Sequence, residues 1–586
     1  MLPVFPSLAT EIGTVRKKWS DRLPVALLYP NTYPVGVSNL GFQLVYSLLN
    51  QYDELVCERF MYPRSGESFR SLESGRLLQE FPVVCVSMSF EEDFPRVAAM
   101  LAAGKIEPFA AARGGRIEPG NPMVILGGVA AFMNPEPLAP FADIVAVGEA
   151  EGILPELVSL LLESSAKERK ELLYQVATRC KGCYVPGFYH FDYDDQSRVS
   201  DIIAEEGIPQ RVEKVLAPAK TEAGYSSLLS PEAELNMFMV ELGRGCSRGC
   251  RFCAAGYIYR PPRLWDSDAV LSAFDNLPRE VQRVGMLGME MASSATLDQV
   301  SSHLETAHCS LSFSSLRADN ISDQLLSLLA ASNLKSVAIA PDGASERLRS
   351  IINKNLREQD LLLAADRLAE IGIHNLKLYI MIGLPTEEMA DLEELVALVQ
   401  TMRNRLLQSG RKQGRLTELT LSVNSFVPKP WTPFQYCSYG GLSSTATAEG
   451  KAVEQSIMAL KKKIQYLRKS LSSLANVRFK VDRPERVLQQ AVFARADRRI
   501  APLLLDLGMG KYSFKQGLKR HNISSYHYAV RPRKKEERMC WEIIDHGIKP
   551  GYLWKEYEKA MAGKFTPPCE TASCTRCGVC GGAPTS

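Results

Sequence analysis

The chain of 586 residues lacks two features that would direct it to a membrane. No stretch reaches about eighteen consecutive apolar residues, the length that a membrane-spanning helix needs. Residues 1–6 contain no charged group followed by an apolar run, so we expect no secretory signal. The sequence therefore predicts a cytoplasmic protein.

A strong net charge is also missing, but the near balance hides an asymmetry. The chain carries 69 Lys and Arg against 66 Asp and Glu. Residues 441–586 hold 27 of these basic residues and 13 of the acidic ones, which leaves 42 against 53 elsewhere. A basic C-terminal part is typical of proteins that meet a polyanion such as RNA or a phosphate-bearing lipid. The alternative interpretation is a solvated helical surface.

Fourteen cysteines in a chain of this type favour metal or redox chemistry over a disulfide framework. Three of them lie at 246–253 and four at 569–580. Cys180 and Cys183 form a CxxC that we interpret as structural. The remaining five are scattered and are predicted to be small buried hydrophobes: Cys57, Cys85, Cys309, Cys437 and Cys540.

The N-terminal part alternates apolar, strand-like runs with helical patterns. The runs lie at 24–30, 82–88, 122–126 and 143–147, and a helical pattern at 39–49 follows the first of them. Such alternation predicts a parallel sheet covered on both faces. We expect an open, doubly wound α/β domain over residues 20–165. Residues 166–234 are predicted to be a linker region with some strand pairing.

Alternation then resumes over roughly 200 residues. Six strands are predicted, at 237–242, 284–288, 310–314, 335–340, 376–382 and 418–424. Helical segments separate them, which predicts a partial TIM barrel of the (β/α)6 type over residues 235–440. In such barrels the chemistry lies at the carboxyl ends of the strands. Residues 441–586 are predicted to be helix-rich and basic, without clear strand alternation, and to end in a Cys-rich tail.

The strongest motif follows the first barrel strand. It places Cys246, Cys250 and Cys253 on one short loop. Three thiolates can bind three irons of a cubane [4Fe–4S] cluster, which leaves the fourth iron without a protein ligand. A structural zinc site fits poorly, because no fourth Cys or His stands nearby. The loop therefore predicts an iron–sulfur site with one open position.

The spacing C-x3-C-x2-C, with an aromatic Phe252 before the last cysteine, is the signature of the radical S-adenosylmethionine (SAM) superfamily. Residues 20–440 resemble the branch that carries an N-terminal cobalamin-binding-type, Rossmann-like domain, and they are also similar to the methylthiotransferases. The resemblance rests on the segments 127–128, 134–144, 147–149, 315–319, 340–349, 351–354, 381–387 and 426–434. It is specific for the superfamily and this branch, and not for a substrate.

The resemblance implies a SAM site at the strand ends. Gly288 and Glu290 stand where the family has a Gly-Gly-Glu-like loop for the SAM amino group, although Met289 replaces a glycine. Ser315 and Arg317 would hold the SAM ribose and carboxylate, since an Arg fork suits a carboxylate. Relatives often carry Pro-Glu where this chain has Pro-Asp342, so the role of that position stays open.

The N-terminal domain would bind cobalamin at the carboxyl edge of its sheet. Four residues there are the candidates: Gly127, Gly128, Gly148 and Glu149. The Asp-x-His-x-x-Gly motif is absent and no histidine precedes His190, so any cobalamin would bind without a His ligand from this domain. The alternative is an empty domain in which Phe90 and Phe132 fill the site.

The C-terminal tail gives a second candidate metal site. Cys574, Cys577 and Cys580 have the C-x2-C-x2-C spacing of ferredoxin-type loops, and Cys569 stands five residues earlier as a fourth ligand. An auxiliary [4Fe–4S] cluster and a four-Cys zinc site both fit this pattern. Disordered thiols are the third interpretation.

Together these features predict a radical SAM enzyme. The resemblance implies reductive cleavage of SAM to a 5′-deoxyadenosyl radical, with electrons from a donor such as flavodoxin or ferredoxin. With cobalamin, the outcome would be methylation of an unactivated carbon. Two alternatives stay open: a methylthiotransferase-like modification of RNA or protein, and a non-catalytic iron–sulfur or cobalamin sensor.

Overall fold

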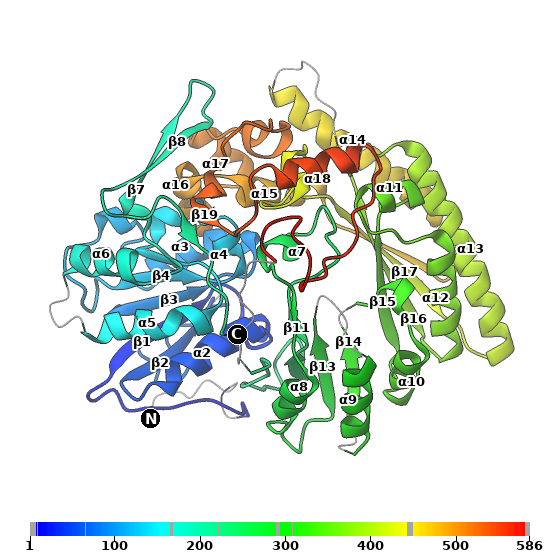
Figure 1. The fold of residues 1–586 in the computed structure, drawn as a ribbon, viewed down its shortest axis with the longest axis horizontal. Coiled ribbons are helices and arrows are strands. Elements are labelled where there is room, and N and C mark those ends of the chain that lie inside the picture. The colour runs from blue at the N-terminus through cyan, green and yellow to red at the C-terminus, as the bar shows by residue number, and fades with distance from the viewer. Residues whose placement is uncertain are drawn as a thin grey trace. The chain divides into compact units, whose positions relative to one another are not determined.

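The computed structural model describes residues 8, 10–64, 66–163, 168–218, 222–288, 294–306, 309–313, 315–441 and 449–580. The chain forms two compact units (Figure 1). The first unit comprises Met1–Asn236, Phe493–Ser524 and Glu536–Gly547. The second comprises Met237–Val492, Ser525–Lys535 and Ile548–Ser586. Residues that follow the barrel strands thus contribute to both units.

The first unit is built on a six-stranded sheet in the order β2-β1-β3-β4-β5-β6. All neighbours are parallel except β6, which runs antiparallel to β5. The strands are β1 (Leu23–Tyr29), β2 (Leu55–Met61), β3 (Val83–Ser87), β4 (Met123–Gly127), β5 (Ile144–Ala146) and β6 (Cys183–Tyr184). Continuous apolar runs form them because both faces of a parallel sheet are covered. The expected doubly wound α/β fold is confirmed.

Helices follow the strands of this sheet in the sequence. They are α1 (Tyr33–Val37), α2 (Leu40–Gln51), α3 (Phe94–Ala103), α4 (Val129–Met133), α5 (Ala150–Glu163) and α6 (Arg169–Arg179). The α2 helix packs on β2 and against α5. Two later helices, α16 (Ala501–Gly508) and α17 (Phe514–Arg520), also belong to this unit, and α16 packs on α3.

Short pairs of strands complete the first unit. An antiparallel hairpin joins β7 (Tyr189–Tyr193) to β8 (Val199–Ala204), as the linker pattern predicted. The two-residue strands β9 (Val212–Glu213) and β19 (Ile544–Asp545) pair in parallel. This pairing fixes the segment around residue 544 to a part of the chain more than 300 residues earlier.

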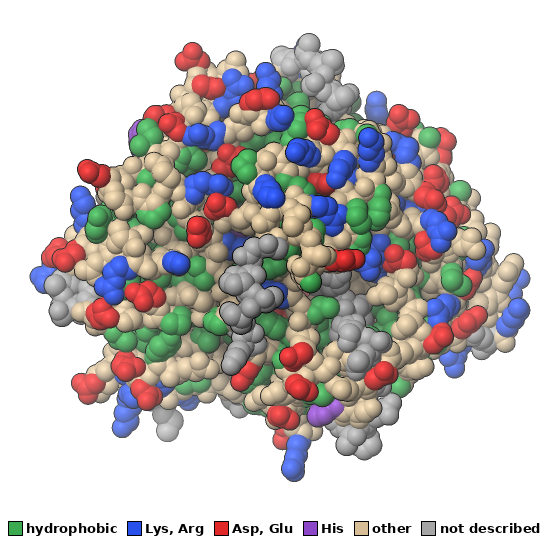
Figure 2. Space-filling view, in the orientation of Figure 1, with side chains coloured by type: hydrophobic (Ala, Val, Ile, Leu, Met, Phe, Trp, Pro, Cys, Tyr) green, Lys and Arg blue, Asp and Glu red, His purple; other side chains and the backbone are tan. Residues whose placement is uncertain are grey.

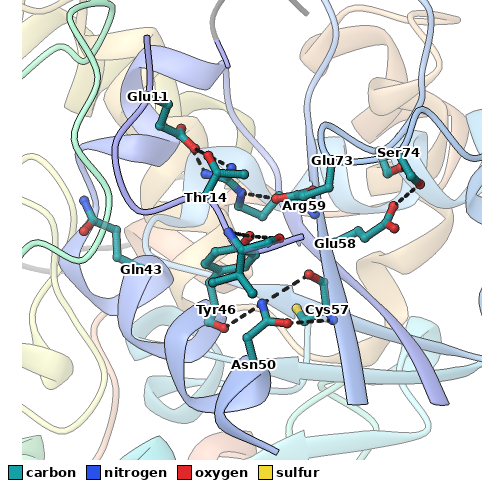
Figure 3. A network of polar contacts seen from close by, with 12 residues as sticks. Glu11, Thr14, Gln43, Tyr46, Asn50, Cys57, Glu58, Arg59, Glu73 and Ser74 are labelled. Carbon is teal, nitrogen blue, oxygen red and sulfur yellow. Dashed lines mark hydrogen bonds and ion pairs between the residues drawn. The ribbon is translucent and has the colours of Figure 1, made fainter. Parts of the chain in front are cut away.

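A buried polar network holds the edge strand β2 (Figure 3). The Arg59 side chain is fully buried, and its guanidinium contacts the carboxylates of Glu11 at 2.5 Å and Glu73 at 2.6 Å. The guanidinium also lies 4.6 Å from the ring centre of Tyr46. Two carboxylates therefore share one buried cation, and the segment around residue 11 is fastened beside β2.

In its described residues, the second unit contains seven parallel strands in two sheets. One sheet has the order β10-β13-β14 and the other β15-β16-β17-β18. The strands are β10 (Phe238–Glu241), β13 (Arg283–Leu287), β14 (Ser310–Phe313), β15 (Ser336–Asp342), β16 (Asn375–Ile382), β17 (Glu418–Ser425) and β18 (Val477–Val481). An isolated parallel bridge between Leu316 and Ile339 links the two sheets. The six expected barrel strands are confirmed.

The seventh strand, β18, was not expected. It pairs with β17 from Leu419 opposite Val477 to Val423 opposite Val481. Its sequence alternates apolar and basic residues, and its inner positions are only half-buried. The expectation that the C-terminal part has no strand alternation was wrong here, because the two basic residues concealed a short strand with one covered face.

Helices alternate with these strands and then continue to the C-terminus (Figure 1). They are α7 (Ala255–Ile258), α8 (Ser267–Phe274), α9 (Ser294–Thr306), α10 (Asp323–Ala331), α11 (Glu346–Ile351), α12 (Glu358–Glu370), α13 (Met389–Gln413), α14 (Glu449–Leu471), α15 (Pro484–Arg495) and α18 (Tyr552–Met561). None of the described helices is long and apolar enough to cross a bilayer.

Many basic residues of the C-terminal part lie on solvent-exposed surfaces. In α14 the buried positions recur every three or four residues, from Ala452 to Leu471, so its lysines lie mostly on the other side of the helix. Figure 2 shows acidic and basic side chains interspersed over the described surface of one face. Mixed charge of this kind is typical of a solvated surface.

Candidate metal centre

The three-cysteine loop begins directly after β10. Its first residues form β11 (Gly243–Arg244), which pairs antiparallel with β12 (Arg263–Leu264), and its last cysteine precedes α7. Gly245 has a φ of +84°, and a Cβ there would lie 2.8 Å from the carbonyl oxygen of Tyr259. The backbone N–H of Cys253 donates to the carbonyl of Cys250 at 3.2 Å. The hairpin and the glycine therefore wind the loop tightly at the carboxyl end of the strand.

Burial and nearby cations have opposite effects on the pKa values of the loop thiols. Burial raises the pKa of the Cys250 thiol, while the nearby cations Lys354, Arg317 and Arg248 lower it in part. Burial likewise raises the pKa of Cys253, to about 11. Both thiols are thus protonated at neutral pH in the metal-free chain, and binding of an iron cluster must release their protons. Three thiols on one loop, ringed by cations, fit a cubane cluster with one open iron.

The predicted SAM residues lie at two strand ends. Gly288 follows β13 and is exposed. Glu290 falls outside the described residues. Ser315 follows β14 and is exposed as well. The Arg317 guanidinium contacts Asp319 at 2.7 Å and donates to the carbonyl of Lys354.

A buried ion pair that the sequence analysis assigned no role stands beside the loop. The Lys354 Nζ lies 2.7 Å from Oδ2 of Asp342, which ends β15. Burial raises the pKa of Asp342, and burial alone would lower that of Lys354, but the nearby Asp342 carboxylate helps to raise the pKa of Lys354 on balance. Asp342 has a φ of +63°, an unusual conformation for a residue other than glycine. Strand-end strain of this kind often marks a functional position.

The residues predicted for cobalamin have their own structural partners. A Cβ on Gly128, whose φ is +96°, would lie 2.5 Å from the carbonyl oxygen of Met88. A Cβ on Gly148 would lie 2.1 Å from the carbonyl oxygen of Val215. The Glu149 carboxylate accepts from the backbone N–H of Ala217 at 2.6 Å. These positions serve close packing of the chain against itself.

Gly127 is less constrained. It ends β4, pairs with Ser87 of β3, and a Cβ there would only reach ordinary contact with Ala146, at 3.7 Å. Of the three candidate glycines, it is the one whose missing side chain is not required by nearby backbone. The sequence could not show that neighbouring backbone already occupies the space beside Gly128 and Gly148.

The strand order points to another part of the same edge. In an open α/β sheet, ligands bind where the strand order reverses, and the order β2-β1-β3-β4-β5 reverses between β1 and β3. Asn31 follows β1 and donates to Asp93 at 3.2 Å, and Ser89 follows β3 and accepts from Asn39 at 3.1 Å. Phe90 is 51% exposed there, whereas Phe132 is buried against His546. Phe90 is therefore not packed into the sheet edge, unlike Phe132.

The other cysteines differ in their surroundings. Cys57, Cys437 and Cys540 are buried, whereas Cys85 and Cys309 are partly exposed. The Cys180 and Cys183 sulfurs lie 3.3 Å apart and are both buried. Among the tail cysteines, Cys577 and Cys580 are buried and Cys569 and Cys574 are half-buried.

Comparison with known proteins decides the family. Residues 240–399 match the model of the Radical SAM superfamily, and residues 41–186 match the model "Radical SAM proteins, N-terminal". The chain is a radical SAM protein. The first match spans the cysteine loop and the strand ends from β10 to β16. The second runs from α2 to β6 and includes every strand of the six-stranded sheet except β1.

A relative of this radical SAM protein is "Uncharacterized protein MJ0966" of Methanocaldococcus jannaschii. It is 26% identical over 506 residues, which cover 85% of this chain and 94% of the relative. Two solved structures are similar in part. The cobalamin-dependent SAM radical enzyme OxsB, with aqua-cobalamin and SAM bound, is 12% identical with a TM-score of 0.42, covering 87% of this chain and 85% of that one. Coproporphyrinogen III oxidase from Escherichia coli is 15% identical with a TM-score of 0.27, covering 40% and 52%.

Proposed function

We propose that this radical SAM enzyme binds a [4Fe–4S] cluster on Cys246, Cys250 and Cys253 and cleaves SAM reductively. The observation that carries the proposal is the placement of three thiols on one loop beside the buried Lys354–Asp342 pair. The loop supplies three ligands, and the neighbouring strand ends supply groups for an amino acid and a ribose. Radical SAM enzymes as a class need an external electron donor, and we include a flavodoxin or ferredoxin in the proposal.

When bound, the cluster would pass one electron from the external donor to the sulfonium of SAM, and the cleavage of SAM would supply the capacity to abstract a hydrogen atom from a substrate carbon. The chain's own residues position the reactants. Lys354 and Arg317 present positive charge near Cys250, where a carboxylate is best stabilised. The exposed Ser315 hydroxyl is available to a ribose hydroxyl. The Asp342 carboxylate keeps the Lys354 ammonium protonated and oriented.

A second candidate function, cobalamin-dependent methylation of an unactivated carbon, is favoured by the N-terminal sheet. Its order matches a doubly wound sheet that binds its ligand between β1 and β3. We propose that a corrin would lie over Ser89 and the exposed Phe90, and near Gly127, rather than on Gly128, Gly148 or Glu149. Aromatic side chains suit the flat face of such a ligand.

Iron content and SAM cleavage test the main proposal. The variants Cys246→Ala, Cys250→Ala and Cys253→Ala, reconstituted anaerobically, should each lose about one cubane of iron. Cys309→Ala is the matched control and should keep it. Reduced wild-type protein with SAM should release 5′-deoxyadenosine, and the three variants should not. Unchanged iron in all three variants would refute the cluster assignment, and no 5′-deoxyadenosine under any reductant would favour a sensor.

Absorbance spectra test the second candidate. Protein produced with cobalamin should retain the bands of a bound corrin, and Phe90→Ala should weaken that retention. Gly127→Leu should block it by filling the edge of the sheet, whereas Tyr174→Ala, at an exposed position on α6, is the control. A wild-type protein that retains no corrin refutes this candidate and leaves SAM cleavage unaffected.

A further inference from the structure

The four cysteines of the C-terminal tail gather in one place. The Cys569 and Cys580 sulfurs lie 3.5 Å apart, and the Cys574 thiol lies beside Cys569. Cys577 is 1% exposed, and its backbone carbonyl accepts from the N–H of Lys549 at 2.8 Å. The tail is thus folded around its cysteines.

The tail lies directly on the three-cysteine loop of the same unit. The backbone N–H of Cys569 donates to the carbonyl of Ser247, the residue after Cys246, at 2.8 Å. Ser247 and Gly249 line the same small recess as Cys569, Cys574 and Arg576. Residues of the three-cysteine loop and of the tail therefore line one recess.

Side chains of the barrel fasten the tail in this position. The Asn353 amide donates to the carbonyls of Thr566 at 3.0 Å and Arg248 at 3.2 Å, and its oxygen accepts from the N–H of Thr566 at 2.9 Å. Arg251, which follows Cys250, donates to the carbonyl of Lys564 at 2.5 Å. Arg251 of the loop and Asn353, which precedes Lys354, thus both bind the tail.

We propose that Cys569, Cys574, Cys577 and Cys580 hold a second [4Fe–4S] cluster next to the first. Four cysteines within twelve residues, three of them at equal spacing, are typical of a cubane loop. Structural zinc sites usually join two pairs of ligands from separate stretches of chain. The assignment uses only the tail's own residues and does not depend on SAM cleavage.

The tail thiols lie closer together than a bound cubane would hold them. A zinc site draws its four thiolates around one ion. In a cubane each thiolate binds its own iron, so the Cys569 and Cys580 sulfurs, which lie 3.5 Å apart, must separate when the cluster enters. The spacing of the cysteines along the chain, and not the present distance between the sulfurs, therefore carries the assignment.

Positive charge is provided for such a cluster. The Arg576 Nε donates to the Cys574 sulfur at 3.3 Å, and its Nη2 holds the carbonyl of Pro568 at 2.6 Å. Arg260 is 5% exposed and acts on both Cys577 and Cys580 through its charge. Two arginines therefore offset the negative charge that four thiolates would bring into a half-buried site.

Metal analysis of four full-length proteins tests the proposal. The wild type, purified anaerobically, should contain about eight irons per chain. The loop variant C246A/C250A/C253A and the tail variant C569S/C574S/C577S/C580S should each keep about four, and the combined variant almost none. A loop variant without iron overturns the proposal. One zinc per chain that only the tail variant loses also overturns it and assigns a zinc site instead.

Electron paramagnetic resonance gives an independent readout. The reduced loop variant should still show a cubane signal, and SAM should leave that signal unchanged, because SAM binds only a cluster with an open iron. The tail variant should show a signal that SAM shifts. Since the loop variant leaves the tail intact, a misfolded tail variant does not remove the test. A loop variant with no cubane signal refutes the second cluster even if the wild type cleaves SAM.

Discussion

The Nζ atom of Lys354 lies 2.7 Å from Oδ2 of Asp342, at the carboxyl end of β15 and beside Cys250. Each side chain is only 14% exposed, so water solvates the pair poorly. Burying an ion pair costs desolvation energy, so a gain in stability alone does not account for this pair. In the proposed function, this cation would stabilise the carboxylate of SAM beside the open iron.

Replacing Lys354 by Met should therefore weaken SAM binding. A hydrogen bond to a charged group contributes about 1.5–3 kcal/mol, or about ten- to hundredfold in affinity. The SAM concentration needed for half-maximal release of 5′-deoxyadenosine should therefore rise by about ten- to hundredfold. Lys354→Arg should recover most of the affinity, because it keeps the charge.

Iron content separates this effect from loss of the cluster. Lys354→Met should keep the iron of the wild type, and Lys412→Met, at an exposed position of α13, should change neither quantity. If Lys354→Met loses its iron together with its activity, the residue supports the loop instead of SAM.

Arg251 should be required for docking of the tail. Its guanidinium donates to the carbonyl of Ile351 at 2.8 Å and lies 3.6 Å from the buried carboxylate of Glu556. Arg251→Met removes one of the two cations of that carboxylate, since Lys559 lies 2.8 Å from its other oxygen. The loss should be about 1.5–3 kcal/mol in the unfolding free energy of the second unit. Limited proteolysis should then cut before Cys569 faster than in the wild type.

The double variant Arg251→Met/Glu556→Gln should recover part of that stability, because the side chain at position 556 then carries no buried charge. Arg357→Met is the control, since its pair with Asp360 is largely exposed and contributes at most about 1 kcal/mol. Equal losses in the single and double variants would contradict the importance of the ion pair.

The strands and the cysteine loop were predictable because their signals are local. Apolar runs between helical patterns identified six barrel strands, and the C-x3-C-x2-C spacing marked the loop. The strand β18 was missed because Arg478 and Lys480 interrupt its apolar residues. Its alternation was present, but a five-residue pattern in a basic region is a weak signal.

Contacts between distant residues could not be predicted in this way. The docking of Cys569 on Ser247 joins positions more than 300 residues apart, and no local pattern encodes it. The packing role of Gly128 against Met88 was hidden for the same reason. Lys354 was part of a recognised segment, yet only the structure shows that it faces Asp342 and Cys250.

The buried Arg59 network should be a main support of the first unit. Arg59→Met leaves the Glu11 and Glu73 carboxylates buried without a cation, and burial already raises the pKa of Glu73. We expect a loss of about 3–5 kcal/mol in the unfolding free energy of that unit, measured by denaturant titration. Arg76→Met, whose pair with Glu80 is exposed, should cost at most about 1 kcal/mol. Similar losses in the two variants would contradict this.

Acid should destabilise the first unit through His546. Burial, followed by the charge of Lys214, holds the pKa of its imidazole well below the usual value. The unfolded chain protonates this side chain below about pH 6.5 while the native state keeps it neutral, so acid stabilises the unfolded state. The His546 contribution to stability is therefore retained above that pH and falls by up to about 1.4 kcal/mol per pH unit below it.

The variant His546→Gln has no such titration. Unfolding free energies of both proteins, measured from pH 8 to pH 5, should therefore diverge only below about pH 6.5, with the wild type falling faster. Other titrating groups contribute equally to both proteins, so parallel curves would show that His546 titrates normally in the native state.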